Sequence, residues 1–80
     1  MTKDEIFDAV RQAILEVLPD LPAKEISIEK SLVELGANSV DRMEVVMMSM
    51  EALGLKIPLM RFAGVGNLAG LVDVLFNSQD

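Results

Sequence analysis

Residues 36–54 read GANSVDRMEVVMMSMEALG and predict one helix over about Ser39–Leu53. Apolar side chains recur through this segment at the three- and four-residue spacing of a helix. Asn38 or Ser39 can cap its first turn, because both side chains accept hydrogen bonds from free backbone N–H groups. Gly54 suits the left-handed conformation that commonly ends a helix. The helix therefore carries its own start and stop signals.

This predicted helix has more apolar surface than one buried face needs. One apolar stripe consists of Val45, Val46, Ser49 and Leu53. A second apolar stripe on the same helix is rich in methionine. Its methionines either fill gaps in a broad core contact or form an adaptable surface that binds other proteins. We favour the second interpretation, because an apolar strip rimmed by carboxylates suits partner recognition. The predicted docking face consists of Val40, Asp41, Met43, Glu44, Met47, Met50 and Glu51.

Three other segments are predicted to be helical: Thr2 or Lys3 to Leu18, a short turn over Leu59–Ala63, and Leu68–Phe76. A long loop over Asp20–Asn38 follows the first of them. Its apolar side chains are expected to pin it to the core, and they are Ile26, Ile28, Leu32 and Leu35. We therefore expect an all-α fold, a four-helix bundle with a long first loop and a short third helix, in one domain over residues 1–80.

The residue types that the chain lacks exclude several kinds of chemistry. It has no cysteine and no histidine, so it offers no thiol nucleophile, no imidazole base, no thiolate metal site and no histidine, the commonest transition-metal ligand. Its net charge of −6 would repel nucleic acid and attract a basic protein surface. No apolar run is long enough to span a bilayer, and the acidic N-terminus is unlike a signal peptide. We expect a cytoplasmic monomer that binds neither metal nor nucleic acid.

Ser39 lies where the loop becomes the helix. Serine is a preferred helix cap, and most serines at helix starts have no other role. If Asn38 is the cap instead, the Ser39 hydroxyl is free. A phosphate group on that hydroxyl would then lie at the positive end of the helix dipole, where anions are stabilised. On these residues alone, both roles of Ser39 stay open.

The stretch Leu32–Asp41, followed by Glu44 and Val45-Val46, resembles the signature of acyl carrier proteins. In that family a D-S-L or D-S-V at the modified serine follows an L-G-x turn. Ile57-Pro58 also matches the I-P after the family's second helix, and the resemblance covers essentially the whole chain. It implies the carrier-type four-helix bundle, with 4′-phosphopantetheine joined to Ser39 by a phosphodiester. The thiol of this arm would hold an acyl group as a thioester, which explains how a carrier works without cysteine.

The resemblance also implies partners for the chain. A phosphopantetheinyl transferase would install the arm from coenzyme A. An acyltransferase, and a ketosynthase or a hydroxymethylglutaryl-CoA-synthase-like enzyme, would then act on the cargo. Phe62 and Met60, in the short third helix, would either flank the arm or fill the core.

Three residues depart from the family pattern. Asn38 replaces an aspartate, Arg42 adds a positive charge, and Met50 replaces an acidic residue. Arg42 could bind a carboxylate of a partner or simply be solvated, and of the two we expect solvation. Docking should therefore depend more on apolar contact than it does in fatty-acid carriers. The pattern is similar to that of free-standing donor carriers in bacterial polyketide β-branching cassettes, which present an acetyl or malonyl unit.

Other classes of function fit the sequence less well. A calcium sensor needs a loop of oxygen ligands around a central glycine, and no such loop occurs. Ser39 has no imidazole or lysine base beside it in the sequence, so a serine-based enzyme is not expected. The rival to the carrier is an unmodified helical module that binds other proteins. The mass of the protein after incubation with coenzyme A and a transferase distinguishes the two.

Overall fold

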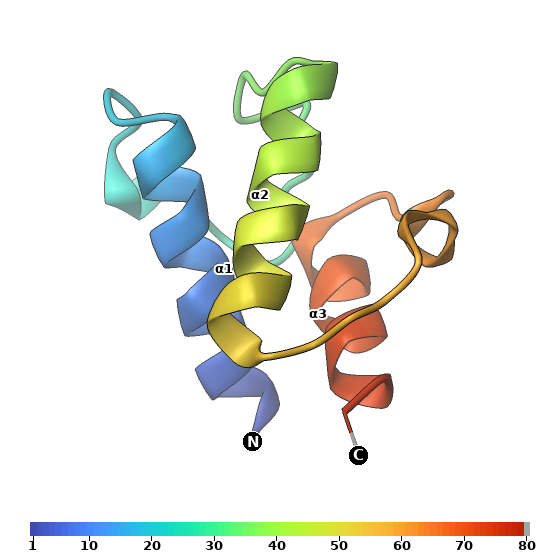
Figure 1. Ribbon diagram of the computed structural model, residues 1–80. Coiled ribbons are helices and arrows are strands. Elements are labelled where there is room, and N and C mark those ends of the chain that lie inside the picture. The colour runs from blue at the N-terminus through green and yellow to red at the C-terminus, as the bar shows by residue number, and fades with distance from the viewer. Residues whose placement is uncertain (80) are drawn as a thin grey trace.

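The computed structural model describes residues 1–79, and all regular structure within them is helical (Figure 1). Its three α-helices are α1 (Lys3–Val17), α2 (Ser39–Leu53) and α3 (Leu68–Asn77). Two short 3-10 turns, η1 (Ala23–Glu25) and η2 (Leu59–Phe62), lie between them. The predicted all-α class and helix order are confirmed. The expected third helix is a single 3-10 turn, and η1 in the long loop was not predicted.

Local hydrogen bonds begin α1 at the predicted place. The Glu5 N–H donates to the Thr2 hydroxyl at 3.2 Å, and the Thr2 N–H donates to the Glu5 carboxylate at 2.8 Å. These bonds form the predicted capping box. Hydrogen bonds from Thr2 lower the pKa of the Glu5 carboxyl, since they stabilise its charged form. The bond from the Thr2 backbone N–H has the largest effect, and the bond with the Thr2 side chain comes second.

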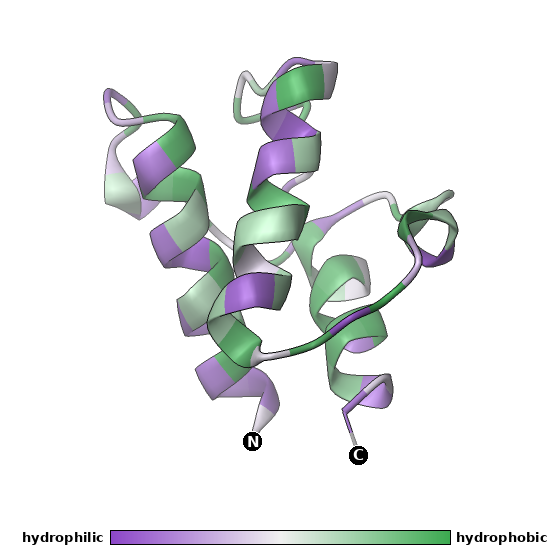
Figure 2. Ribbon diagram, in the orientation of Figure 1, coloured by the Kyte–Doolittle hydropathy of each residue, from purple (hydrophilic) through white to green (hydrophobic). Residues whose placement is uncertain are grey.

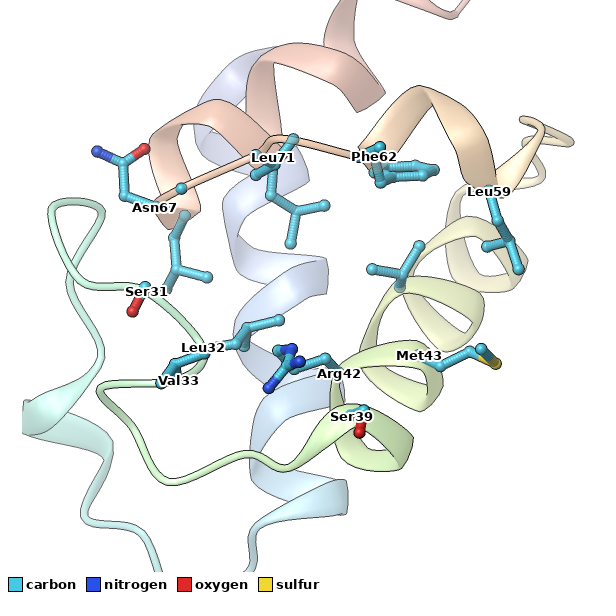
Figure 3. A pocket seen from close by; sticks show the side chains of 15 residues that line it. Ser31, Leu32, Val33, Ser39, Arg42, Met43, Leu59, Phe62, Asn67 and Leu71 are labelled. Carbon is cyan, nitrogen blue, oxygen red and sulfur yellow. The ribbon is translucent and has the colours of Figure 1, made fainter.

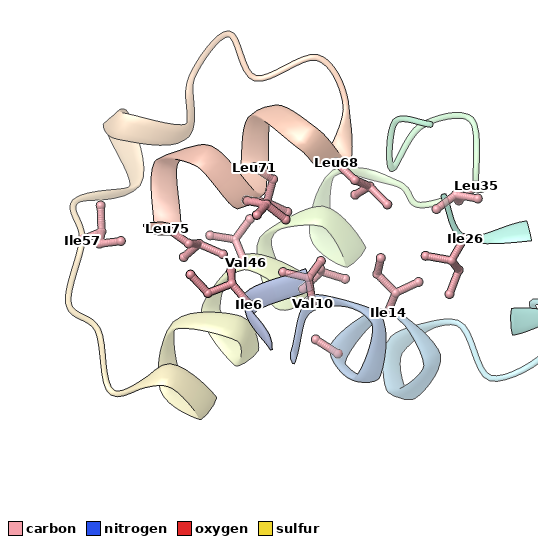
Figure 4. Close-up of a cluster of buried hydrophobic side chains, with 13 residues drawn as sticks. Ile6, Val10, Ile14, Ile26, Leu35, Val46, Ile57, Leu68, Leu71 and Leu75 are labelled. Carbon is pink, nitrogen blue, oxygen red and sulfur yellow. The ribbon is translucent and has the colours of Figure 1, made fainter. Parts of the chain in front are cut away.

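The core lies where α1, α2 and α3 face one another. Figure 4 shows Ile6, Val10 and Ile14 of α1 in the same cluster as Leu71 and Leu75 of α3. From α2, the cluster receives the first predicted stripe, whose buried members include Val45 and Val46. The Ser49 hydroxyl in this stripe is also buried, and it donates to the Val45 carbonyl at 2.7 Å. A polar side chain is tolerated here because its donor is satisfied within the helix.

The long loop is held to the core at fewer side chains than predicted. Ile26 and Leu35 are buried and Leu32 is half-buried, whereas Ile28 is 47% exposed, so its prediction as a pin was wrong. The backbone of the loop makes the connection instead. The carbonyls of Lys30 and Ile28 accept hydrogen bonds from the Leu68 and Ala69 N–H groups at 2.8 and 2.9 Å. These bonds satisfy free N–H groups in the first turn of α3 and fix the loop beside it.

Among residues 1–79, no helix has the length and apolar character needed to cross a membrane.

Candidate functional site

The first turn of α2 leaves the Ser39 hydroxyl unused. Asn38 is the cap: its side-chain oxygen accepts a hydrogen bond from the Asp41 N–H at 2.8 Å. The Asp41 carboxylate in turn accepts from the Asn38 N–H at 3.1 Å, which completes a capping box. Ser39 is the first residue of the helix and is exposed. Of the two roles left open by the sequence, the capping role therefore belongs to Asn38.

The Asn38 cap predicts a measurable contribution to stability. Replacing Asn38 with Ala should lower the free energy of unfolding by about 1 kcal/mol, because the Asp41 N–H loses its acceptor. Asn38→Asp keeps an oxygen acceptor in place and should stay within about 0.5 kcal/mol of the parent protein. Urea unfolding followed by circular dichroism measures both. Equal stability of the Ala and Asp variants would mean that Asn38 does not cap α2.

A cavity of about 500 Å³ opens beside Ser39. It is formed by the loop around Ser31–Val33, by α2, by η2 and by the start of α3 (Figure 3). Most of its lining is apolar and comes from Leu32, Val33, Met43, Val46, Leu59, Phe62, Ala63, Val65, Leu68 and Leu71. Among the lining residues, polar side chains come from Ser31, Ser39, Arg42 and Asn67. A chain-like group that starts at Ser39 would thus meet an apolar surface next to its point of attachment.

Arg42 is not mainly solvated, so that expectation was wrong. The side chain is half-buried, and its Nη1 donates a hydrogen bond to the Ala37 carbonyl at 3.1 Å. Figure 3 shows it extending from α2 toward Leu32 of the loop. Ser39 and Arg42 line the same cavity. Sequence spacing placed Arg42 one turn after Ser39, but it did not indicate the fold of the loop that gives the guanidinium its acceptor.

The predicted docking face is largely exposed. Val40, Met43 and Met47 are 64%, 53% and 51% exposed, and Glu44 and Glu51 are exposed with them. Figure 2 shows hydrophobic and hydrophilic bands alternating along α2. Two members differ from the rest of the face. Met50 is half-buried and packs against the core, and the Asp41 carboxylate is engaged by the Asn38 N–H.

The structure adds two exposed apolar residues that the sequence did not single out as candidate site residues, Val33 and Leu59, and it shows that Met60, which the sequence did single out, is exposed as well. Val33 and Leu59 line the cavity and are 62% and 45% exposed, and Met60 of η2 is 85% exposed. Met60 therefore does not fill the core, whereas Phe62 is half-buried and both lines the cavity and packs on the core. No motif or spacing in the sequence indicated that Val33 and Leu59 lie at a site. Their position around the cavity follows from how η2 and the loop pack.

No group of three or more acidic, histidine or cysteine side chains in residues 1–79 is arranged to hold a metal ion.

Comparison with known proteins identifies the family. Residues 8–75 match the family described as "Phosphopantetheine attachment site". The chain belongs to this family. Such a domain carries 4′-phosphopantetheine covalently on a serine, so the predicted cofactor is confirmed. The protein is accordingly an acyl carrier and not an enzyme, and the unmodified interaction module is set aside.

Two relatives of this carrier cover nearly its whole length. It is 46% identical, over 96% of its chain and 94% of the relative, to the polyketide biosynthesis acyl-carrier-protein AcpK of Bacillus subtilis (strain 168). It also matches a chain in the crystal structure of the curacin biosynthetic pathway HMG synthase in complex with acetyl donor-ACP. That match has a TM-score of 0.86 and 35% identity, and covers 94% of this carrier and 96% of the other chain.

Proposed function

We propose that this carrier bears its arm on Ser39 and presents an acetyl or malonyl thioester to a hydroxymethylglutaryl-CoA-synthase-like enzyme of polyketide biosynthesis. The observation that carries the attachment site is the free, exposed Ser39 hydroxyl at the start of α2, beside the cavity. The choice of enzyme rests on the solved relative, a carrier in complex with an HMG synthase, and on the polyketide relative. The cytoplasmic localisation and the monomeric state of the carrier stay predictions.

Comparison of the five serines supports Ser39. Ser49 is buried and bonded within its helix, and the Ser31 hydroxyl accepts a hydrogen bond from the Glu34 N–H at 3.0 Å. The Ser78 hydroxyl is inaccessible, and Ser27 is half-buried. Ser39 is thus the exposed serine with no competing hydrogen bond among the described residues. A transferase can reach its hydroxyl without unfolding any element.

The charges around Ser39 also favour a phosphodiester there. A helix N-terminus stabilises an anion through its free N–H groups and its dipole. Asn38 supplies the cap and is uncharged. The family's aspartate at this position would place a negative charge beside the phosphate. The remaining nearby carboxylate, Asp41, is held by the Asn38 N–H. The attached phosphate therefore has one negative charge fewer beside it than it would have with the family's aspartate at position 38.

The proposal is tested in two steps. Incubation with coenzyme A and a broad-specificity phosphopantetheinyl transferase should raise the intact mass by one phosphopantetheine, and peptide mapping should place it on Ser39. Acetyl- and malonyl-loaded protein are then each mixed with a synthase from a polyketide pathway and acetoacetyl acceptor carrier. Transfer of carbon from the loaded carrier supports the assigned role. If the carrier is loaded but no such synthase uses it, the carrier function of the family stands and the assignment to β-branching is wrong.

The docking face predicts that Met47→Glu impairs partner recognition without unfolding the protein. The new carboxylate would be desolvated against an apolar partner surface, so the KM of the transferase for the carrier should rise about tenfold. Because Met47 is exposed, stability should change by no more than about 0.5 kcal/mol. Gln12→Glu is the matched control, since it adds the same charge to an exposed position on α1. Equal KM values for the two variants would show that charge alone, and not the face, matters.

A further inference from the structure

Arg42 is a cation held beside the proposed attachment site, and it has no anionic partner within the described residues 1–79. It lies one helical turn after Ser39, so the two side chains share a face of α2. Residues 1–79 contain two ion pairs, Lys3–Asp73 and Lys30–Glu25, and neither involves Arg42. Within residues 1–79, the hydrogen bond from Nη1 to the Ala37 carbonyl is the one side-chain hydrogen bond that Arg42 makes. The other N–H groups of its planar fork stay available to an acceptor.

The position of this head group is set by the structure. The Ala37 carbonyl belongs to the residue before the cap, so its hydrogen bond draws the guanidinium back along α2 toward the helix start. Ala37 is itself buried, which makes the acceptor a rigid one. The half-buried side chain keeps part of its charge away from bulk water. Both features strengthen an interaction with a nearby anion.

We propose that Arg42 binds the phosphodiester that joins the arm to Ser39, and so holds the beginning of the arm at the mouth of the cavity. This inference rests on the proposed attachment at Ser39. Arginine is suited to the task, because its fork presents parallel N–H groups to phosphate oxygens. A carboxylate on the cargo is a less suitable partner for Arg42, since it lies at the far end of a flexible arm. Arg42 is thus a positioning residue for the arm and takes no part in chemistry.

The inference is tested by a thermodynamic cycle between the arm and Arg42. Melting temperatures are measured for the unloaded and loaded forms of the parent protein and of Arg42→Gln. The change on loading in the parent should exceed the change in Arg42→Gln by about 2–4 °C, because only the parent gains the phosphate contact. The cycle subtracts the loss of the Ala37 hydrogen bond, which lowers both forms of the variant equally.

Two further variants and a second measurement sharpen the result. Arg42→Lys keeps the charge but not the fork, and should keep part of the increment. Arg61→Gln removes an equal charge from an exposed residue outside the cavity lining and should keep all of it. The phosphorus-31 signal of loaded protein should shift in Arg42→Gln and stay in place in Arg61→Gln.

Intact mass separates the possible failures. If the parent protein gains no mass, the proposed attachment is wrong and this inference falls with it. If the parent protein is loaded but the increment and the phosphorus signal are the same with and without Arg42, only the inference is overturned. An equal loss in Arg42→Gln and Arg61→Gln would also overturn it, since net charge would then account for the effect.

Discussion

Ser39→Ala should produce a folded carrier that accepts no arm at all. The hydroxyl oxygen is the proposed bond-forming atom, and alanine has no substitute for it. The helix should be unaffected, since Asn38 provides the cap and the Ser39 hydroxyl makes no hydrogen bond within the described residues that the substitution would remove. Alanine is also the better helix former. Intact mass after incubation with coenzyme A and transferase measures loading, and circular dichroism measures the fold.

Ser31→Ala is the matched control for this variant. Ser31 lines the same cavity, so it is the serine that a misdirected transferase would meet next. Its hydroxyl accepts the Glu34 N–H, so its loss should cost some stability and leave loading intact. A full mass increase in Ser39→Ala, or none in Ser31→Ala, would move the attachment away from Ser39.

Leu75→Ala should be the most destabilising of the substitutions considered. Leu75 of α3 has no exposed surface, and it packs in the cluster where α3 meets α1. Removing its side chain costs about 2–5 kcal/mol, through lost burial and the cavity that remains. For a domain of this size that corresponds to a fall in melting temperature of roughly 10–30 °C. Total stabilities of small domains are about 5–15 kcal/mol, so a substantial unfolded fraction is expected on warming.

Met60→Ala provides the contrast, since it also shortens a large apolar side chain. Met60 is 85% exposed and outside the core, so its replacement should change stability by about 0.5 kcal/mol or less. Leu75 does not line the cavity, and the variant therefore tests the packing of α3 separately from the site. Thermal unfolding followed by circular dichroism gives both values. A fall of only a few degrees for Leu75→Ala would contradict the described contact between α3 and α1.

The helices and their caps were accessible from the residue order, because their causes are local. The Thr2 and Asn38 boxes link residues three positions apart, and Gly54 adopts the expected left-handed conformation with φ of 68°. The serine and the carrier pattern around it lie within a single continuous segment. Periodicity also identified the buried stripe of α2, of which Val45 and Val46 are in the core.

Long-range packing settled the features that periodicity left undefined. Met47 and Met50 have the same residue type on one predicted stripe, yet Met47 is exposed and Met50 packs on the core. Ile28 reads as a core residue, but its backbone carbonyl, rather than its side chain, joins the loop to α3. Arg42 reads as solvated, but the path of the loop places the Ala37 carbonyl within its reach. The outcomes for Met50 and Ile28 depend on segments far apart in the chain, and the outcome for Arg42 depends on the path of the loop just before α2. Helical periodicity encodes neither.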